Sequence, residues 1–299
     1  MPEGDVVWRT ARRLQRALAG RDLLASDLRW PSLATVDLAG RPVLEVVSAG
    51  KHLLTRVGGT QGEPPVTLHS HLRMEGSWFV EPTGDPHGRR SDTGIRAVLT
   101  TADWTAVGHK LGMLDLVPTS REGDLVGHLG PDLLRPGWDP AQARERLLRQ
   151  SDRAVGEALL DQRVLAGVGT FYMAEACFLA RLTPWSPVSD VRDPVAFVDL
   201  VHRLLDVNKE RVDQVTTGDL RRGRQNFVHA RSGLPCLRCG AGVRVAPLGA
   251  PPRDRTAFYC PGCQVGPAPT DDGRPQRPLG HTRRSVPGAT KGPTYRTRR

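Results

Sequence analysis

Four cysteines near the C-terminus have the spacing of a metal site. Two Cys-x2-Cys pairs are separated by twenty residues, and their members are Cys236, Cys239, Cys260 and Cys263. Four thiolates arranged in this way bind one tetrahedral Zn²⁺ and leave no position open for water. Two disulfides or a redox pair are the alternatives, but the charged N-terminus has no apolar signal segment and no βαβ pattern surrounds either pair. We therefore predict one structural zinc ion.

Arginines around these cysteines indicate a polyanionic partner. Arg244, Arg253 and Arg255 lie between the pairs, and the run Arg-Arg-Gly-Arg occupies 221–224. The whole chain has 42 Lys+Arg against 32 Asp+Glu, a net charge of +10 and a pI near 10.1. Guanidinium groups on a metal-pinned hairpin suit phosphate, so nucleic acid is the predicted partner. A merely soluble basic protein is the alternative.

The N-terminus offers a nucleophile. Removal of Met1 would expose the secondary amine of Pro2, which can attack a carbonyl-type carbon and form an iminium. A helix is expected to start at Asp5, and its positive end lowers the pKa of a nearby amine. Glu3 is placed to carry protons. From composition alone, however, Pro2 is an ordinary helix-entry proline.

Lys51 is the second candidate catalytic residue. The chain has only four lysines among its 42 basic residues, and Lys51 follows Gly50 at an expected strand turn. An ammonium donates a proton or meets a phosphate as a compact point charge, which a guanidinium does less well. The alternative is an incidental surface lysine.

The elements that must position these residues fall into two groups. Apolar residues recur with helical spacing over 5–18, with Asp5 as the expected N-cap and Gly20 as the stop. Short Val- and Leu-rich segments then follow to about 117, and they predict a β-sandwich or barrel. The expected strands are 43–47, 52–57, 66–71, 77–80 and 95–100.

Beyond Pro131 the pattern is helical. Helices are expected from Pro140, over 154–160, over 170–182 and from Pro194 to about 212. The most apolar stretch, 164–180, is too short and too polar to span a membrane, and we expect a buried helix hairpin there. A free Cys177 in that stretch fits a reduced, cytoplasmic location. Residues 265–299 have the composition of a disordered basic tail.

Six motifs occur in the order found in one known family. They are Pro2-Glu-Gly, Gly50-Lys-His-Leu-Leu, Ser70-His-Leu-Arg-Met-Glu-Gly, Leu129-Gly-Pro-Asp, the 160–169 segment ending Gly-Val-Gly, and the four-cysteine finger. From residue 2 to about 264 the chain resembles the formamidopyrimidine-DNA glycosylase/endonuclease VIII family of bifunctional repair enzymes. The opening Pro-Glu-Gly and the ending Cys-Pro-Gly-Cys-Gln resemble the endonuclease VIII branch.

The resemblance implies roles for particular residues. The family's nucleophile corresponds to Pro2. Glu3 corresponds to the glutamate that assists opening of the sugar ring, and Lys51 corresponds to the lysine that binds phosphate and helps to protonate the departing base. Met74 matches the wedge that enters the duplex when a base flips out, and Arg73 lies beside it. A core methionine is the alternative for Met74. The phosphate-binding finger arginine falls on Arg255, five residues before Cys260.

Two positions depart from the family pattern. Asp5-Val6 stand where the family usually has proline and a second glutamate. Thr170 stands after Gly-Val-Gly, where the family usually has an asparagine that touches phosphate. A threonine hydroxyl still donates one hydrogen bond, but altered substrate binding is expected.

The resemblance also implies an α+β multidomain fold. We expect an N-terminal helix with a β-sandwich domain (1–120), a linker (121–138), a helix-two-turns-helix domain (139–233), a four-cysteine zinc finger (234–264) and the tail (265–299). About 20 residues between the last helix and the finger leave little room for a purine-enclosing loop. Oxidised pyrimidines and abasic sites are therefore the expected lesions, with strand cleavage by β/δ-elimination.

Partners and alternatives complete the expectation. Damaged duplex DNA is the expected partner, with single-stranded or bubble DNA as further candidates, and a cytoplasmic, nucleoid-associated monomer without membrane contact is expected. Two other interpretations stay open: a catalytically silent DNA-binding relative, and a zinc-ribbon regulator or RNA-binding protein. The latter gives no role to Pro2, Glu3 or Lys51.

Overall fold

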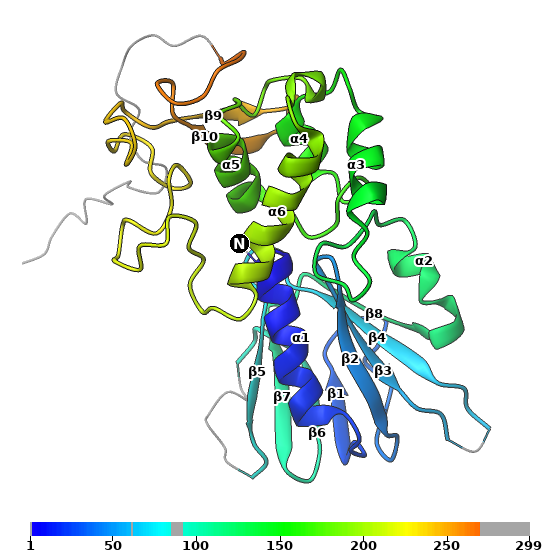
Figure 1. Ribbon diagram of the computed structural model, residues 1–299. Helices are drawn as coiled ribbons and strands as arrows, with labels where there is room; N and C mark the ends of the chain where they lie inside the picture. Colours follow the sequence, from blue (N-terminus) through cyan, green and yellow to red (C-terminus); the bar gives the residue numbers. More distant parts are fainter. Residues whose placement is uncertain (1, 61, 85–91, 270–299) are drawn as a thin grey trace, which may run out of the picture.

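The computed structural model describes residues 2–60, 62–84 and 92–269, and within them the chain forms two halves (Figure 1). The N-terminal half contains helix α1 (Gly4–Leu18) and eight strands in two antiparallel sheets of order β1-β6-β7-β5 and β2-β3-β4-β8. The strands are β1 Ala25–Leu28, β2 Val43–Ala49, β3 His52–Val57, β4 Val66–His71, β5 Ser77–Pro82, β6 Ile95–Thr100, β7 Trp104–His109 and β8 Met113–Pro118.

The sandwich prediction is confirmed, because one buried apolar cluster is shared by α1 and both sheets. Val7, Leu14 and Leu18 contribute to it from the helix, at the spacing that the sequence showed. Strands β1, β7 and β8 lie in the predicted β-rich region but were not predicted individually.

Helix α1 corrects one expectation. It begins at Gly4 and its N-cap residue is Glu3, so the prediction of an Asp5 cap is wrong. The reason is tertiary: the Gly4 N–H donates to the Gly167 carbonyl oxygen at 2.9 Å, and a Cβ on Gly4 would lie 2.9 Å from the Gly167 Cα. The helix start is therefore set by backbone contact with the other half.

The C-terminal half is helical. Its elements, after the short η2 (Thr119–Arg121) and α2 (Gly123–Val126), are α3 Pro140–Leu148, α4 Val155–Leu160, α5 Thr170–Leu179, η3 Val188–Asp190 and α6 Pro194–Asn208. Pro140 and Pro194 occupy first turns as predicted, each after an aspartate that caps the helix through its side chain. Helix α6 ends four residues before the predicted 212, and α5 ends three before the predicted 182.

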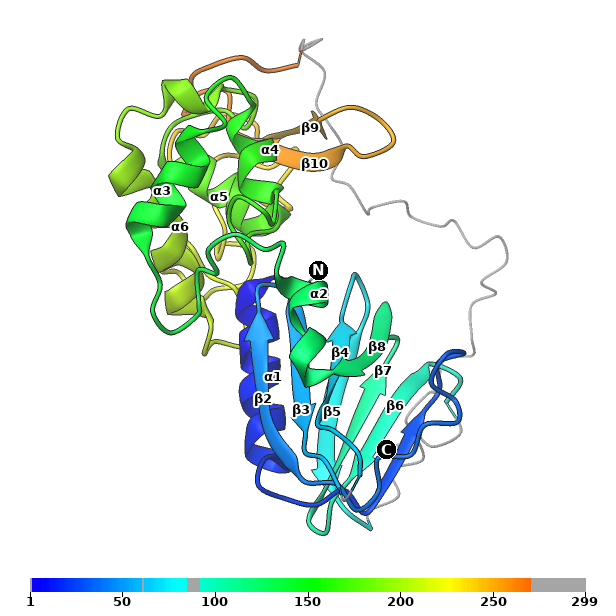
Figure 2. The ribbon, with the colours of Figure 1, turned by 90° about the vertical axis from the view of Figure 1, so that its right-hand side faces the viewer.

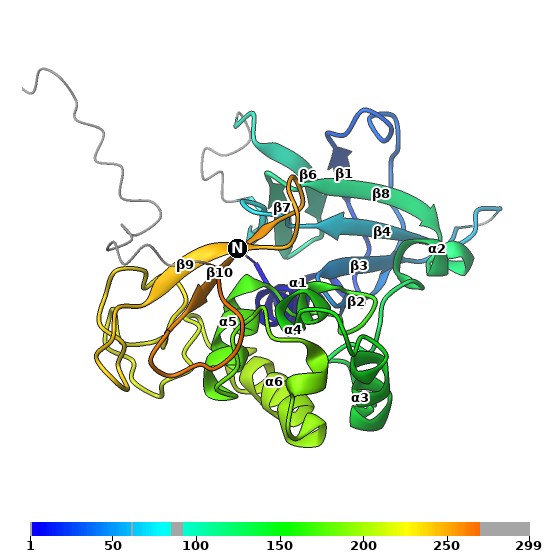
Figure 3. The ribbon, with the colours of Figure 1, turned by 90° about the horizontal axis from the view of Figure 1, so that it is seen from above.

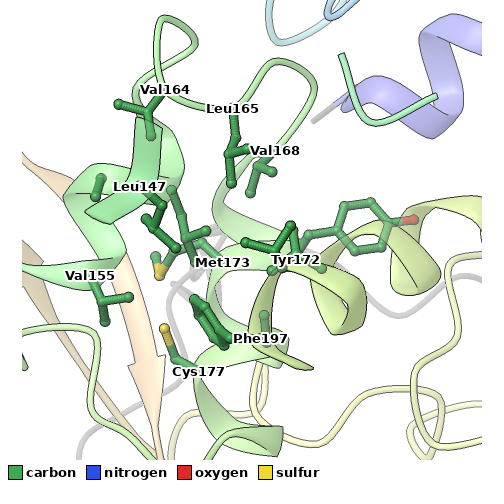
Figure 4. Packing of buried hydrophobic residues seen from close by; sticks show 14 of the residues in the cluster. Leu147, Val155, Val164, Leu165, Val168, Tyr172, Met173, Cys177 and Phe197 are labelled. Atoms are coloured by element: carbon green, nitrogen blue, oxygen red, sulfur yellow. The ribbon is translucent and has the colours of Figure 1, made fainter. Parts of the chain in front are cut away.

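The segment 164–180 is buried, as predicted, but it is not a helix hairpin. Residues 161–169 form a turn-rich loop that leads into α5, the single helix of that stretch. Figure 4 shows Val164, Leu165 and Cys177 among the apolar side chains packed around α5. Cys177 is fully buried and unpaired, as expected.

The two halves meet at the N-terminus of the chain, which both Figure 1 and Figure 2 place at their junction. The hairpin β9 (Arg244–Leu248) and β10 (Arg255–Tyr259) belongs to the upper half, and Figure 3 shows it from above. None of the described helices is long and apolar enough to cross a membrane. Most of the predicted tail, 270–299, lies outside the described residues.

Candidate active site

Glu3 joins the N-terminus to the helical half. Its side chain is 1 % exposed, and its carboxylate accepts hydrogen bonds from the N–H groups of Gly169 at 2.8 Å and Phe171 at 2.7 Å. These donors are the unpaired N–H groups at the start of α5, which favour a carboxylate. A Cβ at Gly169 would collide with that carboxylate. The second glycine of the Gly-Val-Gly motif therefore leaves room for the side chain of Glu3.

Lys51 is positioned by a second contact between the halves. Gly50, with φ +56°, makes the turn between β2 and β3 and donates its N–H to Asp132 Oδ2 at 2.8 Å. Asp132 lies in the segment between α2 and α3, so the Leu-Gly-Pro-Asp motif holds the turn that carries Lys51. This role of the motif could not be read from the sequence, because its partner is 82 residues away.

Electrostatics couple Glu3 and Lys51. Burial raises the pKa of the Glu3 carboxyl, and the Lys51 ammonium opposes that rise. Burial lowers the pKa of Lys51, which the charge of Glu3 opposes and the charge of Arg255 reinforces. An acid and a base whose pKa values are both moved toward neutrality are suited to exchanging protons near pH 7.

A cavity of about 580 Å³ opens beside Pro2. Its wall includes Val6 and Arg9 of α1, Leu72 before β5, and Val212 after α6. It therefore lies between the sandwich and the segment that follows α6, directly beside the candidate nucleophile. A cavity of this size is large enough for a small ligand group such as a nucleobase.

The loop after β4 presents the predicted wedge. Met74 is 67 % exposed, which excludes the core-methionine alternative. Arg73 has φ +54°, and its N–H donates to His71 Nδ1 at 2.9 Å. The Lys110 ammonium, just after β7, pairs with Glu75 at 3.1 Å. Met74 and Arg73 thus lie on one exposed loop, which contacts with His71 and Lys110 hold in shape.

A histidine network beside this loop was missed from the sequence. His69 Nδ1 lies 2.9 Å from Asp115 Oδ2, and His69 Nε2 lies 2.8 Å from His52 Nδ1. Burial lowers the pKa of His52 to about 3 and that of His71 to about 4. These two imidazoles are therefore neutral at pH 7. The spacing of His69 and His71 on one strand was visible, but their pairing with β3 and β8 needs the register.

Thr170 and Arg255 approach the site from the helical half. Thr170 is the first residue of α5, between the two N–H groups that bind Glu3. Arg255 begins β10, is exposed, and lies within electrostatic reach of Lys51. The structure therefore brings Glu3, Lys51 and Arg255 to one region.

The four cysteines form a separate cluster. Their sulfur atoms all lie within 4.8 Å of one another, with 3.8 Å between Cys236 and Cys263 and 3.5 Å between Cys239 and Cys260. Zn–S bonds of about 2.3 Å in a tetrahedron require sulfur separations of about 3.8 Å. No pair is at bonding distance for a disulfide. The donor set therefore fits one metal ion.

Comparisons with known proteins agree with this arrangement. The formamidopyrimidine-DNA glycosylase N-terminal domain matches residues 1–112, and the H2TH domain of the same glycosylase matches 129–218. The chain is 52 % identical over 276 residues to a "Probable endonuclease 8 2" of Streptomyces coelicolor, covering 92 % of this chain and 98 % of that protein. The chain belongs to the formamidopyrimidine-DNA glycosylase/endonuclease VIII family.

Further relatives place it on the endonuclease VIII branch of this family. A "DNA-(apurinic or apyrimidinic site) lyase Nei2" of Mycolicibacterium smegmatis is 43 % identical, covering 89 % of this chain and 99 % of that protein. The Lactococcus lactis Fpg in complex with abasic-site DNA has the same fold, with a TM-score of 0.70 at 22 % identity over 88 % of this chain and 100 % of that one. The family's fold, with its helical half and cysteine cluster, is thus confirmed.

Proposed function

We propose that this chain removes oxidised bases, pyrimidines in preference, through an imine formed by Pro2, and then cleaves the strand by β- and δ-elimination. As a member of its family it is a bifunctional DNA glycosylase and AP lyase of base excision repair. The observation that carries the assignment to Pro2 is the burial of Glu3 against α5. That contact holds the N-terminus at the junction of the halves, beside Lys51.

The chemistry assigned to these residues follows from their surroundings. Pro2 precedes α1, whose positive end disfavours an ammonium and so favours the nucleophilic amine. The raised pKa of Glu3 suits it to pass a proton to the opening sugar ring. The lowered pKa of Lys51 suits it to protonate the departing base or to meet a phosphate.

Contacts with DNA are assigned to the exposed residues around this centre. Met74 is the wedge that fills the space of the flipped base, with Arg73 on the same loop. Arg255 on the hairpin and Thr170 at the start of α5 bind backbone phosphates on the side of the helical half. Damaged duplex DNA is the proposed partner, with bubble or single-stranded DNA as further substrates of a cytoplasmic monomer.

The preference for pyrimidines rests on the segment after α6. Because α6 ends at Asn208, this segment is longer than the sequence indicated, but it is tied down at Gln214, at Thr216 and over 227–229. These ties keep it against α5 and α1 and leave the cavity beside Pro2 for a small base. The proposed units remain 1–120, 121–138, 139–233 and 234–264, with a tail from 265.

One structural Zn²⁺ is proposed for Cys236, Cys239, Cys260 and Cys263. When bound, the ion would fix the two turns from which β9 and β10 extend, and so the position of Arg255. Four thiolates leave no site for substrate, so the ion has no part in the reaction itself.

Borohydride reduction in the presence of an oligonucleotide with one abasic site tests the proposal. A covalent adduct is expected, and mass spectrometry should find Met1 absent and the DNA fragment on Pro2. Binding of the same DNA without an adduct would establish the silent-relative alternative. An adduct on a lysine would remove Pro2 from the mechanism.

A further inference from the structure

Asp5 is a buried acid at the active site that the chemistry above does not use. It lies in the first turn of α1, and its side chain is fully buried. Both of its carboxylate oxygens accept from Gln214 Nε2 at 3.0 Å. Val6, next in the chain, lines the cavity beside Pro2. A buried carboxylate is costly unless it has partners or a function.

Tyr172 provides an independent observation at the same place. It is fully buried on α5, and its hydroxyl lies near the Asp5 carboxylate and Gln214, although it makes no hydrogen bond of normal geometry among the residues that the structure describes. Figure 4 shows this hydroxyl pointing away from the apolar cluster. Burial raises the pKa of Tyr172, and the nearby charge of Asp5 adds to the rise, so the phenol remains protonated beside that carboxylate. A polar pocket has therefore been kept around Asp5.

The charged groups near Asp5 come from α1 with its N-cap and from the β2–β3 turn. Lys51 lies on the β2–β3 turn, Arg9 one helical turn further along α1, and Glu3 at the helix start. Glu3 is already engaged by the N–H groups of α5. Arg9 donates to the Arg211 carbonyl oxygen. Asp5 thus lies in the first turn of α1, and its hydrogen-bonding partner Gln214 is a neutral amide.

We propose that Asp5 is a positioning residue for the imine step, supplying the negative charge that stabilises the iminium at Pro2 while Gln214 holds it in place. This inference rests on the proposed function. On an abasic site the Pro2 nitrogen forms a bond to C1′ of the aldehyde. The carbonyl oxygen leaves as water with one proton from the amine and one from the site, and one positive charge remains on the iminium.

Borohydride trapping of Asp5→Asn tests the inference. Asn has the size of Asp but no charge, so trapping on abasic-site DNA should be slower by about tenfold or more. Affinity for DNA containing a tetrahydrofuran abasic analogue, which cannot form an imine, should stay within about twofold. Asp5→Glu should restore part of the rate, and Gln214→Ala should slow trapping by less than Asp5→Asn does. Asp213→Asn, at an exposed neighbour of Gln214, is the matched control and should trap normally.

The pH dependence of the trapping rate distinguishes an electrostatic role of Asp5 from a structural one. Burial raises the pKa of Asp5, so acidification removes its charge early. Protonation of the Pro2 amine slows trapping at low pH in both proteins, but wild-type trapping should lose more of its rate on acidification than Asp5→Asn trapping does. Equal trapping rates and identical profiles would overturn the inference while leaving Pro2 as nucleophile. Parallel loss of trapping and analogue binding in Asp5→Asn and Gln214→Ala would also overturn it, in favour of a structural role. A wild-type enzyme that never traps would overturn the proposed function as well.

Discussion

Glu3 and Glu175 are two buried glutamates with almost the same local surroundings. Each is at most 1 % exposed, and each accepts hydrogen bonds from several backbone N–H groups. Glu3 binds the start of α5. Glu175, in the middle of α5, binds Phe227, Val228 and His229 N–H at 2.8 Å and the Thr216 hydroxyl. Burial raises the pKa of both carboxyls.

What differs is the set of groups that can exchange a proton or a charge with each carboxylate. Glu3 is adjacent to Pro2 and coupled to Lys51 and Asp5. Glu175 instead binds backbone N–H groups of the segment after α6, and its charge opposes the lowering of the pKa of the buried Arg231 guanidinium. A buried carboxylate whose oxygens all accept hydrogen bonds thus has a structural role. A nucleophile and an ammonium group close to it make it suited to catalysis as well.

Removing the proposed zinc should have the largest effect, because the four cysteines flank the hairpin that carries Arg255. Structural zinc contributes about 10–16 kcal/mol to folding in small finger peptides. A strong chelator under reducing conditions should unfold 234–264, abolish DNA binding and leave α1 and the sandwich folded. Metal analysis should find one zinc per chain, and hydrogen exchange should locate the loss. Full protection after chelation would mean that no metal holds the hairpin.

Glu3→Gln should have the next largest effect. Base excision needs proton transfer at the sugar, so it should fall by about a hundredfold or more. Cleavage at a preformed abasic site needs mainly the imine and should fall much less. Single-turnover assays on the two substrates measure the ratio. Equal losses in the excision and cleavage assays would show that Glu3, like Glu175, has only a structural role.

The sequence was most informative where the signal is local. Strands 52–57, 66–71 and 95–100 have the predicted limits because alternation and turn residues define them. The cysteine spacing predicted the cluster. Pro2, Glu3 and Lys51 came from ordered motifs, and their roles remain predictions.

Long-range contacts account for what was missed. The N-cap of α1 was wrong because Gly4 meets Gly167, and the Gly50–Asp132 contact spans 82 residues. Glu175 stands inside an apolar run, where its polar partners, 41 to 54 residues on, leave no local signal. The periodicity of apolar residues does not predict such contacts, because the local pattern of each segment does not depend on the segment that it contacts.

Glu175→Gln should have a moderate effect on stability. An amide N–H₂ in place of one oxygen would face backbone donors, at a cost of about 1–3 kcal/mol. Excision should fall through weaker DNA binding, with the single-turnover rate at saturating DNA unchanged. Glu145→Gln, which removes an exposed ion pair with Arg149, is the control and should cost under about 1 kcal/mol. A lost rate at saturating DNA would place Glu175 in the chemistry.

The pH dependence of stability should give the smallest and sharpest contrast. A carboxyl whose folded pKa lies above its ordinary value of 4.5 keeps its proton in the folded state after the unfolded chain has released it. Stability therefore falls as pH rises from 4.5 through the folded pKa. The unfolding free energy of wild type minus that of Glu175→Gln should decrease over this window, since only wild type has the titrating group.

The matching difference for Glu3→Gln should decrease less, because Lys51 opposes the rise of the pKa at Glu3. Urea unfolding of the zinc-loaded proteins at several pH values measures both differences, and effects common to the thiolates cancel in them. A Glu3 difference as steep as that of Glu175 would mean that Lys51 does not hold the charge of Glu3, and the distinction between the two carboxylates would lose its electrostatic basis.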